Sequence, residues 1–222
     1  MLLHILKAGF VVAWFAGMFF AAGTVRWVRG WVYVGTMLAA VGAMLLVIWR
    51  CNPEMFQARA RLRHKDTKTF DKVFIAIYVP LLLMQPVVAA LDAARLQWSS
   101  MPFGTVYLGA ASFAVASAVI GWVMAVNRFA EQSVRIQTER GHTVVSNGPY
   151  RVVRHPMYVG LILWFLGTAL VLGSLGALAV GCVMTALVVW RTAMEDRTLR
   201  RELPGYEEFT KQTRYRLLPG VW

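Results

Sequence analysis

The chain has 222 residues, of which 58% are hydrophobic and only 15% are charged, and its formal net charge is +12. A water-soluble domain could not bury so large an apolar share, so the composition favours a membrane protein. The basic residues stand in short blocks between apolar runs. This pattern argues against a nucleic-acid partner, because nucleic-acid binding needs a basic face on a soluble surface.

Six apolar runs predict an all-α, polytopic membrane protein with about six transmembrane helices. The runs cover residues 8–25, 31–49, 73–91, 103–126, 157–172 and 175–190. At 1.5 Å per residue, the second run would span about 28 Å and the fifth only about 24 Å, against a hydrocarbon core of about 30 Å. We therefore expect the last two runs to form a short hairpin that turns at residues 173–176.

Lysine and arginine are distributed unequally between the connections. With the N-terminus inside, twenty of them lie in inner segments, whereas only Arg26, Arg29 and Arg95 lie outside. This asymmetry predicts that both termini of the integral membrane protein are cytoplasmic, at the inner membrane if the protein is bacterial. We expect one membrane domain over residues 1–222, in which residues 1–126 form a four-helix scaffold and residues 127–222 carry the polar motifs.

Three inner segments are polar enough to hold structure outside the lipid. The first, residues 51–63, predicts a short amphipathic helix that starts at Pro53. The second, residues 127–155, is too long for a simple connection, and its alternating pattern predicts a strand pair at 134–138 and 143–145 with the turn at Arg140 and Gly141. The third continues the sixth run as a helix until Pro204 and Gly205 stop it.

The stretch from Gly148 to Gly160 places charged and titratable groups beside the membrane, where they are costly. Pro156 suits the first position of a helix, so His155 would be its cap. Free N–H groups of the first turn, together with Arg154, would attract a carboxylate of a cofactor or substrate. Alternatively, Arg154 is a membrane anchor and His155 a satisfied cap. Tyr158 would either present its hydroxyl to a cavity or anchor the helix at the interface.

Glu195 and Asp196 are adjacent acids near the inner end of the last apolar helix. Their spacing allows simple helical ion pairs with Arg191 and Arg200, respectively, and equally allows a site. The four histidines have no paired spacing of the kind that zinc sites use, so we expect no metal. These histidines are His4, His64, His142 and His155.

In combination, these motifs resemble the isoprenylcysteine carboxyl methyltransferase family and its relatives, the phospholipid N-methyltransferases. The resemblance covers residues 127–222 and rests on Gly148-Pro149-Tyr150, on Arg154-His155-Pro156-Met157-Tyr158-Val159-Gly160, on Glu195-Asp196, on Pro204-Gly205-Tyr206 and on Arg214-Tyr215-Arg216-Leu217-Leu218-Pro219. It implies a membrane-embedded enzyme that uses S-adenosylmethionine without a Rossmann domain, and no strand-GxGxxG-helix unit is found in the sequence. Residues 127–222 would then be the cofactor-binding and catalytic half.

The resemblance also implies roles for individual residues. The cofactor pocket would be lined by His142, Val144, Val145, Gly148, Tyr150, His155 and Tyr158, with Glu195 at the amino-acid end of the cofactor. Arg154 would face the polar group of the acceptor at the mouth of a tunnel open to lipid. Glu195, or a water molecule, would take the proton from an amine acceptor. Asp196 stands where the family often has a second glutamate, and a contact through it is left open.

Two other functions compete with the methyltransferase. A membrane reductase of the sterol or lipid type uses a related motif to bind NADPH, but such families usually carry an acid after the glycine, where this chain has Leu161. A lipid-binding scaffold without turnover would keep the same fold. The resemblance implies a lipophilic or small acceptor, with a carboxylate, thiol or amine as its nucleophile. The oligomeric state is left open.

Overall fold

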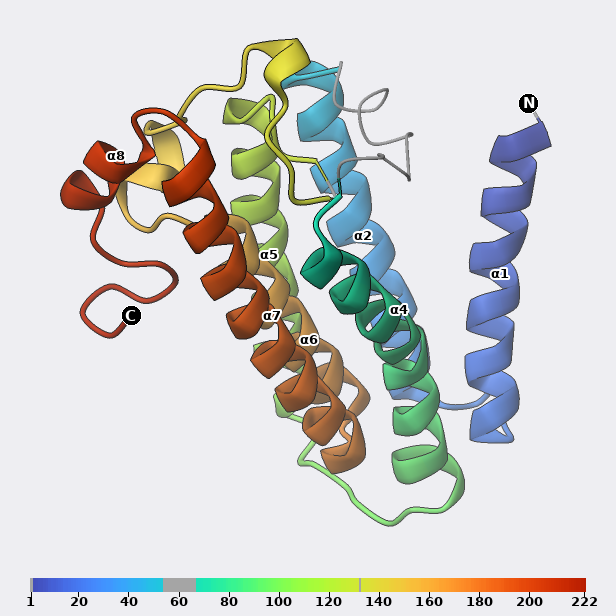
Figure 1. The fold of residues 1–222 in the computed structure, drawn as a ribbon. Coiled ribbons are helices and arrows are strands. Elements are labelled where there is room, and N and C mark those ends of the chain that lie inside the picture. Colours follow the sequence, from blue (N-terminus) through green and yellow to red (C-terminus); the bar gives the residue numbers. More distant parts are fainter. Residues whose placement is uncertain (1, 54–66, 132) are drawn as a thin grey trace.

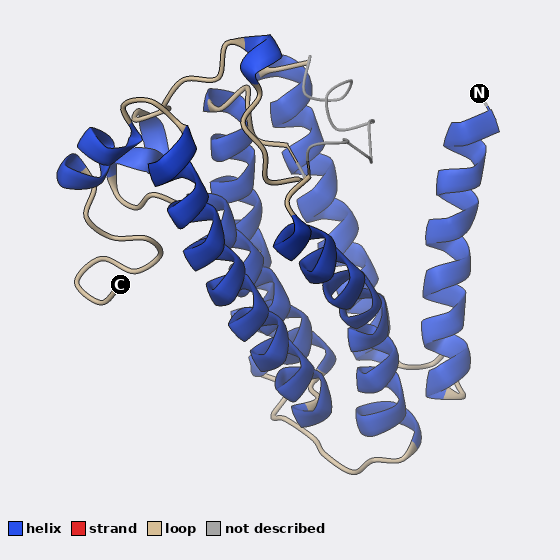
Figure 2. Cartoon of the chain, in the orientation of Figure 1, coloured by secondary structure: helices blue, strands red, loops and turns tan. Residues whose placement is uncertain are grey.

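The computed structural model describes residues 2–53, 67–131 and 133–222, and these residues form a helical bundle (Figure 1). Among them Figure 2 shows helices and loops but no strand. The α-helices are α1 (Leu2–Ala22), α2 (Val28–Cys51), α4 (Thr69–Ala89), α5 (Thr105–Val126), α6 (Pro156–Leu172), α7 (Leu175–Glu202) and α8 (Tyr206–Gln212). The π-helical turn η1 (Ala90–Arg95) extends α4, and the 3-10 helices η2 (Thr138–Arg140) and η3 (Gly148–Arg151) lie in the long loop.

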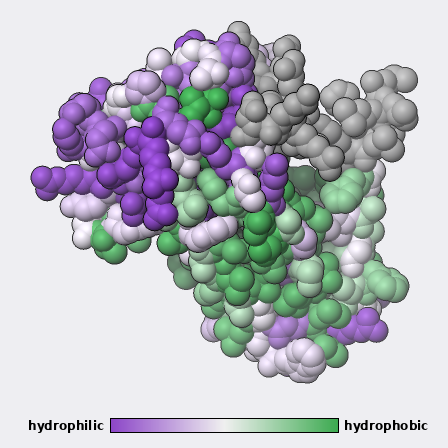
Figure 3. All heavy atoms as spheres, in the orientation of Figure 1, coloured by the Kyte–Doolittle hydropathy of each residue, from purple (hydrophilic) through white to green (hydrophobic). Residues whose placement is uncertain are grey.

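The chain is a polytopic helical membrane protein, as its apolar runs predict. Four helical spans are long and apolar enough to cross a membrane: Val28–Cys51, Thr69–Arg95, Thr105–Val126 and Leu175–Glu202. Two shorter apolar helical stretches, Gly9–Ala22 and Pro156–Leu172, match the first and fifth runs. Apolar residues cover most of the bundle in Figure 3, while hydrophilic residues gather at the end that carries α8 and the long loop.

Helix α6 packs closely between α5 and α7, while α2 lies against α5 and α4 against α7. The contact between α5 and α6 depends on glycine. A Cβ atom at Gly109 would lie 2.7 Å from the backbone N of Val171 and 2.8 Å from the carbonyl oxygen of Gly167. Only a residue without a side chain permits that approach. In contrast, α1 stands at the edge of the bundle, against α4 and η1 (Figure 1).

The predicted hairpin of the last two runs is confirmed, and two charged side chains hold its ends. Helix α6 ends at Leu172, and α7 begins at Leu175 after Gly173, whose φ is +73°. The guanidinium of Arg29 donates to the carbonyl oxygens of Leu170 and Val171, both at 3.2 Å. Opposite it, the carboxylate of Asp92 accepts from the Ser174 hydroxyl at 2.5 Å and the Gly176 N–H at 2.9 Å. Each charge therefore complements the helix end that it meets.

The predicted strand pair at 134–138 and 143–145 is wrong. The Val134 N–H donates to Asp71 on α4 at 2.8 Å, and the Gln137 N–H donates to Nδ1 of His142 at 3.3 Å. The buried Gln137 amide donates to the carbonyl oxygen of Phe129 at 2.8 Å. Side chains thus satisfy the backbone donors that a partner strand would otherwise use, and residues 138–140 form η2.

Of the predictions for the other two inner segments, one is confirmed and the other lies largely outside the described residues. Helix α7 continues to Glu202 and ends just before Pro204 and Gly205, as predicted. Most of the amphipathic helix predicted from Pro53 lies outside the described residues.

Candidate functional site

The first part of the site is the start of α6, which begins at Pro156 with His155 as its cap, as the sequence predicts. The C-terminal segment runs beside this start. The backbone N–H of Arg154 donates to the carbonyl oxygen of Tyr215 at 2.9 Å, and that of His155 donates to Arg216 at 3.0 Å. These two hydrogen bonds hold the C-terminal segment against the start of α6 at one end of the bundle.

The second part is the pair of adjacent acids on α7, which point in different directions because successive helical residues are about 100° apart. Asp196 is fully buried. Its carboxylate accepts hydrogen bonds from five side chains at 2.8–3.3 Å: Arg154, His155, Arg200, Tyr206 and Arg216. The predicted pair with Arg200 is present, but it is one of five contacts. Asp196 therefore joins α6, α7, α8 and the C-terminal segment.

Glu195 points to the other side and accepts a hydrogen bond from the Tyr158 hydroxyl of α6. Beside them, Arg191 donates to the buried carboxylate of Asp71 on α4 at 2.8 Å. Its guanidinium lies 4.5 Å from the centre of the Phe74 ring and 5.5 Å from that of Tyr158. Since Asp71 also accepts from Val134 in the long loop, this arginine ties α4 and the loop to the face of Glu195.

A cavity of about 850 Å³ connects these groups to the membrane-spanning part of the bundle. Most of the predicted site residues line it: His142, Val144, Val145, Tyr150, Arg154, His155, Tyr158 and Glu195. Its other end lies among apolar side chains of α1, α2 and α4, which include Trp14, Met37, Val41, Ile75 and Leu82. One continuous space therefore changes from a polar to an apolar lining along its length.

Two predicted site residues have a different environment from that expected. Gly148 does not contribute to this cavity; its φ is +57°, and a Cβ atom there would lie 3.1 Å from Nε1 of Trp122 on α5. Arg154 lines the cavity, but its guanidinium donates to Asp196 and to the carbonyl oxygens of Thr213 and Arg214. The whole residue is only 4% exposed.

Burial governs the protonation of groups in the loop. Desolvation lowers the pKa of His142, despite the attraction of Glu195 and Glu131 for its charged form. The neutral ring agrees with the geometry, because Nδ1 accepts the Gln137 N–H and therefore carries no proton. Desolvation also raises the pKa of Tyr150, whose hydroxyl accepts from Asn127 at 2.6 Å.

Sequence reasoning missed Asp71 and Ser133. Asp71 is an acid in the first turn of an apolar helix, a signal that could have marked it as a partner for a buried arginine. Ser133 lines the cavity, and its buried hydroxyl has no hydrogen-bond partner among the described residues. An orphaned hydroxyl of this kind suits a ligand contact.

The segment that carries most of this site is similar to known proteins. Residues 104–204 match the family described as phospholipid methyltransferase. Protein-S-isoprenylcysteine O-methyltransferase B of Arabidopsis thaliana is 32% identical over 79 residues, which are 36% of this chain and 35% of the relative. The matched segment of this chain, residues 104–204, is therefore similar to known methyltransferases.

Two further relatives of this segment have names that describe different functions. Protein-S-isoprenylcysteine O-methyltransferase of Schizosaccharomyces pombe is 38% identical over 58 residues, 26% of this chain and 23% of the relative. Cobalt-zinc-cadmium resistance protein CzcN of Cupriavidus metallidurans is 37% identical over 81 residues, 35% of this chain and 37% of the relative. The matched parts thus span little more than a third of these relatives at most. The family match, residues 104–204, contains the predicted site residues from His142 to Glu195.

Proposed function

We propose that the protein is an integral-membrane methyltransferase that uses S-adenosylmethionine to methylate a lipophilic acceptor at the end of the bundle that carries the long loop. The excess of basic residues in the segments at this end supports a cytoplasmic location for it. The observation that carries the proposal is the continuous cavity, in which a polar end beside Glu195 leads to an apolar end between membrane-spanning helices. Such a space suits a water-soluble donor and a membrane-dissolved acceptor.

The polar end fits the donor. When bound, S-adenosylmethionine supplies a methyl group already activated on a sulfonium, so the protein mainly has to align the two reactants. Glu195 would bind the ammonium of the amino-acid end, and the orphaned Ser133 hydroxyl would gain a hydrogen bond. Val144 and Val145 would provide apolar walls for the adenine.

The acceptor would enter from the apolar end, with its nucleophile toward Tyr158 and Glu195. We assign Arg154 a positioning role in place of direct contact, because its donors already bind Asp196 and two carbonyl oxygens. Arg191 also donates to Asp71, but its guanidinium lies against the Phe74 and Tyr158 rings, which line the cavity, so its charge would orient an anionic acceptor group. A carboxylate or thiolate needs no general base, whereas the proton of an amine would pass to Glu195 or to water.

Binding of the demethylated donor to purified protein tests the donor half of the proposal. S-adenosylhomocysteine should bind in the micromolar range and NADPH should not. Glu195→Gln should weaken that binding by about 10- to 150-fold, which corresponds to one charge-assisted hydrogen bond. The matched control is Glu202→Gln on the same helix, which removes only an exposed pair with Lys68 and should bind normally. A preference for NADPH would instead support the reductase, and binding without turnover would support the scaffold.

Transfer of a labelled methyl group to membrane lipid extracts tests the acceptor half. Product should appear in the lipid fraction, and mass spectrometry would identify its nucleophile. Arg191→Lys keeps a positive charge beside Asp71 but loses the planar guanidinium, so it should reduce turnover of an anionic acceptor more than it reduces donor affinity. Equal loss of donor affinity and turnover would mean that Arg191 belongs to the donor end.

A further inference from the structure

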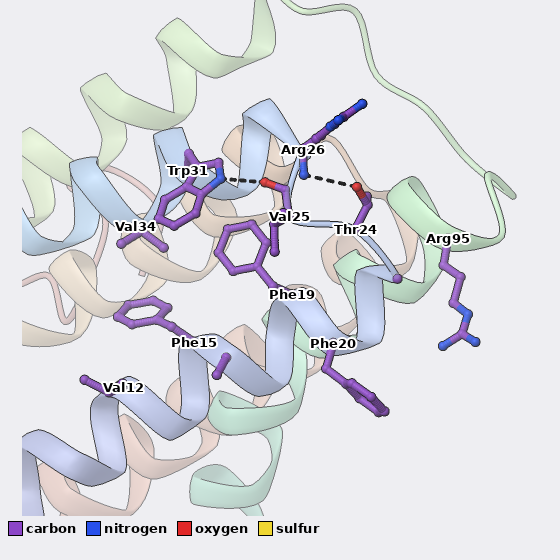
Figure 4. Close-up of a pocket in the computed structure, with 12 residues that line it drawn as sticks. Val12, Phe15, Phe19, Phe20, Thr24, Val25, Arg26, Trp31, Val34 and Arg95 are labelled. Atoms are coloured by element: carbon purple, nitrogen blue, oxygen red, sulfur yellow. Dashed lines mark hydrogen bonds between the residues drawn. The ribbon is translucent and has the colours of Figure 1, made fainter.

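A second hollow lies at the opposite end of the bundle, between α1 and α2 (Figure 4). Its volume is about 970 Å³, and its walls are mainly apolar side chains of the two helices. They include Val12, Phe15, Phe19, Phe20, Trp31 and Val34. Several are open to the surroundings, with Phe20 83% and Trp31 56% exposed. We call this space the α1–α2 groove.

The rim of the α1–α2 groove is built by the turn between the two helices. The backbone N–H of Arg26 donates to the Thr24 hydroxyl at 3.1 Å, and Nε1 of Trp31 donates to the carbonyl oxygen of Val25 at 2.7 Å. Trp31 also packs on Phe19, with ring centres 4.6 Å apart. These contacts fix the turn from which Arg26 projects.

Two arginines stand at this rim, and Figure 4 shows both of them at one end of the groove, with Val12, Phe15 and Val34 toward the other. Arg26 and Arg95 are exposed, and no side-chain acceptor for either is found in the part of the chain that the structure describes. The side chain of Arg95 extends past Gly23, and its Cγ, Cδ and Nε atoms would each lie 3.9 Å from a Cβ atom there.

The remaining charges near this end are already used within the protein. Arg29 binds carbonyl oxygens at the end of α6, and Asp92 binds Ser99, Ser174 and Gly176. Asp92 therefore cannot neutralise the rim without giving up the cap of α7. The rim keeps two positive charges beside an apolar groove, and an external anion would balance them.

We propose that the α1–α2 groove binds an anionic glycerophospholipid of the bilayer, with its phosphate at the rim that carries Arg26 and Arg95 and one acyl chain along the apolar walls. A soluble anion would use the arginines but leave the aromatic walls without a partner. A zwitterionic lipid would fill the walls but carries a choline or ethanolamine cation that opposes the arginines. An anionic lipid satisfies both parts of the groove.

Native mass spectrometry of the full chain, after exchange into mixed micelles of phosphatidylglycerol and phosphatidylcholine, tests the proposal. The protein should retain phosphatidylglycerol at least fivefold better than phosphatidylcholine. Arg26→Gln and Arg95→Gln should each lower that retention about fivefold, as expected for one basic residue near a lipid headgroup. Arg201→Gln, which removes one exposed charge beyond the opposite end of the bundle, should leave it unchanged.

Blocking the groove provides a second, independent measurement. Ala16 lines the groove, whereas Ala13 on the same helix does not. Ala16→Trp should therefore abolish retention of phosphatidylglycerol and Ala13→Trp should preserve it, with thermal melting confirming that both variants fold. Equal retention of the two lipids, or unchanged retention in the double variant Arg26→Gln/Arg95→Gln, would overturn the proposal. None of these substitutions touches the cavity beside Glu195, so donor binding should remain normal whichever result is found.

Discussion

Replacement of each of the adjacent acids of α7 by its amide should have different effects: Asp196→Asn should lower stability, whereas Glu195→Gln should weaken donor binding. Asp196→Asn removes the charge that faces Arg154, which is 4% exposed and keeps only two carbonyl acceptors afterwards. Breaking a buried pair from one side costs about 3–5 kcal/mol. The partners Arg200 and Arg216 have side chains 37% and 28% exposed, so their loss adds at most about 1 kcal/mol each. Glu195→Gln keeps an acceptor for Tyr158 and should cost little stability.

Thermal melting in detergent measures the difference. A total loss of about 3–7 kcal/mol corresponds to a fall in Tm of about 6–28 °C for a domain of this size. Asp196→Asn should show that fall, while Glu195→Gln should melt within about 3 °C of the original and lose affinity for S-adenosylhomocysteine. The reasoning is refuted if Asp196→Asn melts normally, or if the two variants lose stability equally.

Three further predictions concern the bundle and the loop. Arg29→Gln should lower the free energy of unfolding by about 2–3 kcal/mol in a denaturant titration, because carbonyl oxygens at the end of α6 lose a charged donor. Gly109→Ala should cost about 1–3 kcal/mol, since its Cβ atom would meet backbone atoms of α6, whereas Gly35→Ala has open space and should be neutral or better in the same titration. Burial lowers the pKa of His142, so the folded loop binds fewer protons than the unfolded chain; its stability should be constant above about pH 6.5 and fall below it, and His142→Gln should flatten the profile of Tm against pH.

The helical architecture could be predicted because lipid imposes it. Hydropathy and length located the apolar helices, and a run of only sixteen residues at 157–172 predicted the short helix α6. The start of α6 at Pro156 was also predictable, because a fixed φ and a missing N–H suit that position. These are local rules that require no knowledge of neighbouring helices.

Partners of charged side chains could not be predicted in the same way. Four-residue spacing suggested Glu195 as a partner of Arg191, and the two charges do interact, but it gave no sign of Asp71, which is 120 residues away and accepts from Arg191. The alternating residues 134–138 suggested a strand, yet the buried acid of α4 takes the N–H of Val134. Both outcomes depend on which helices lie side by side, and hydrophobic periodicity alone contains no such information.

The two caps of the α6–α7 hairpin bear on how the chain is assembled during its synthesis. Arg29 and Asp92 both precede the hairpin in the sequence, so they leave the ribosome before the helix ends that they bind. When the last two helices enter the membrane, the side chains that cap their ends, Arg29 and Asp92, are therefore already present. A hairpin expressed without the first hundred residues would have to bury uncapped carbonyl and N–H groups, and we expect the cell's quality control to degrade it.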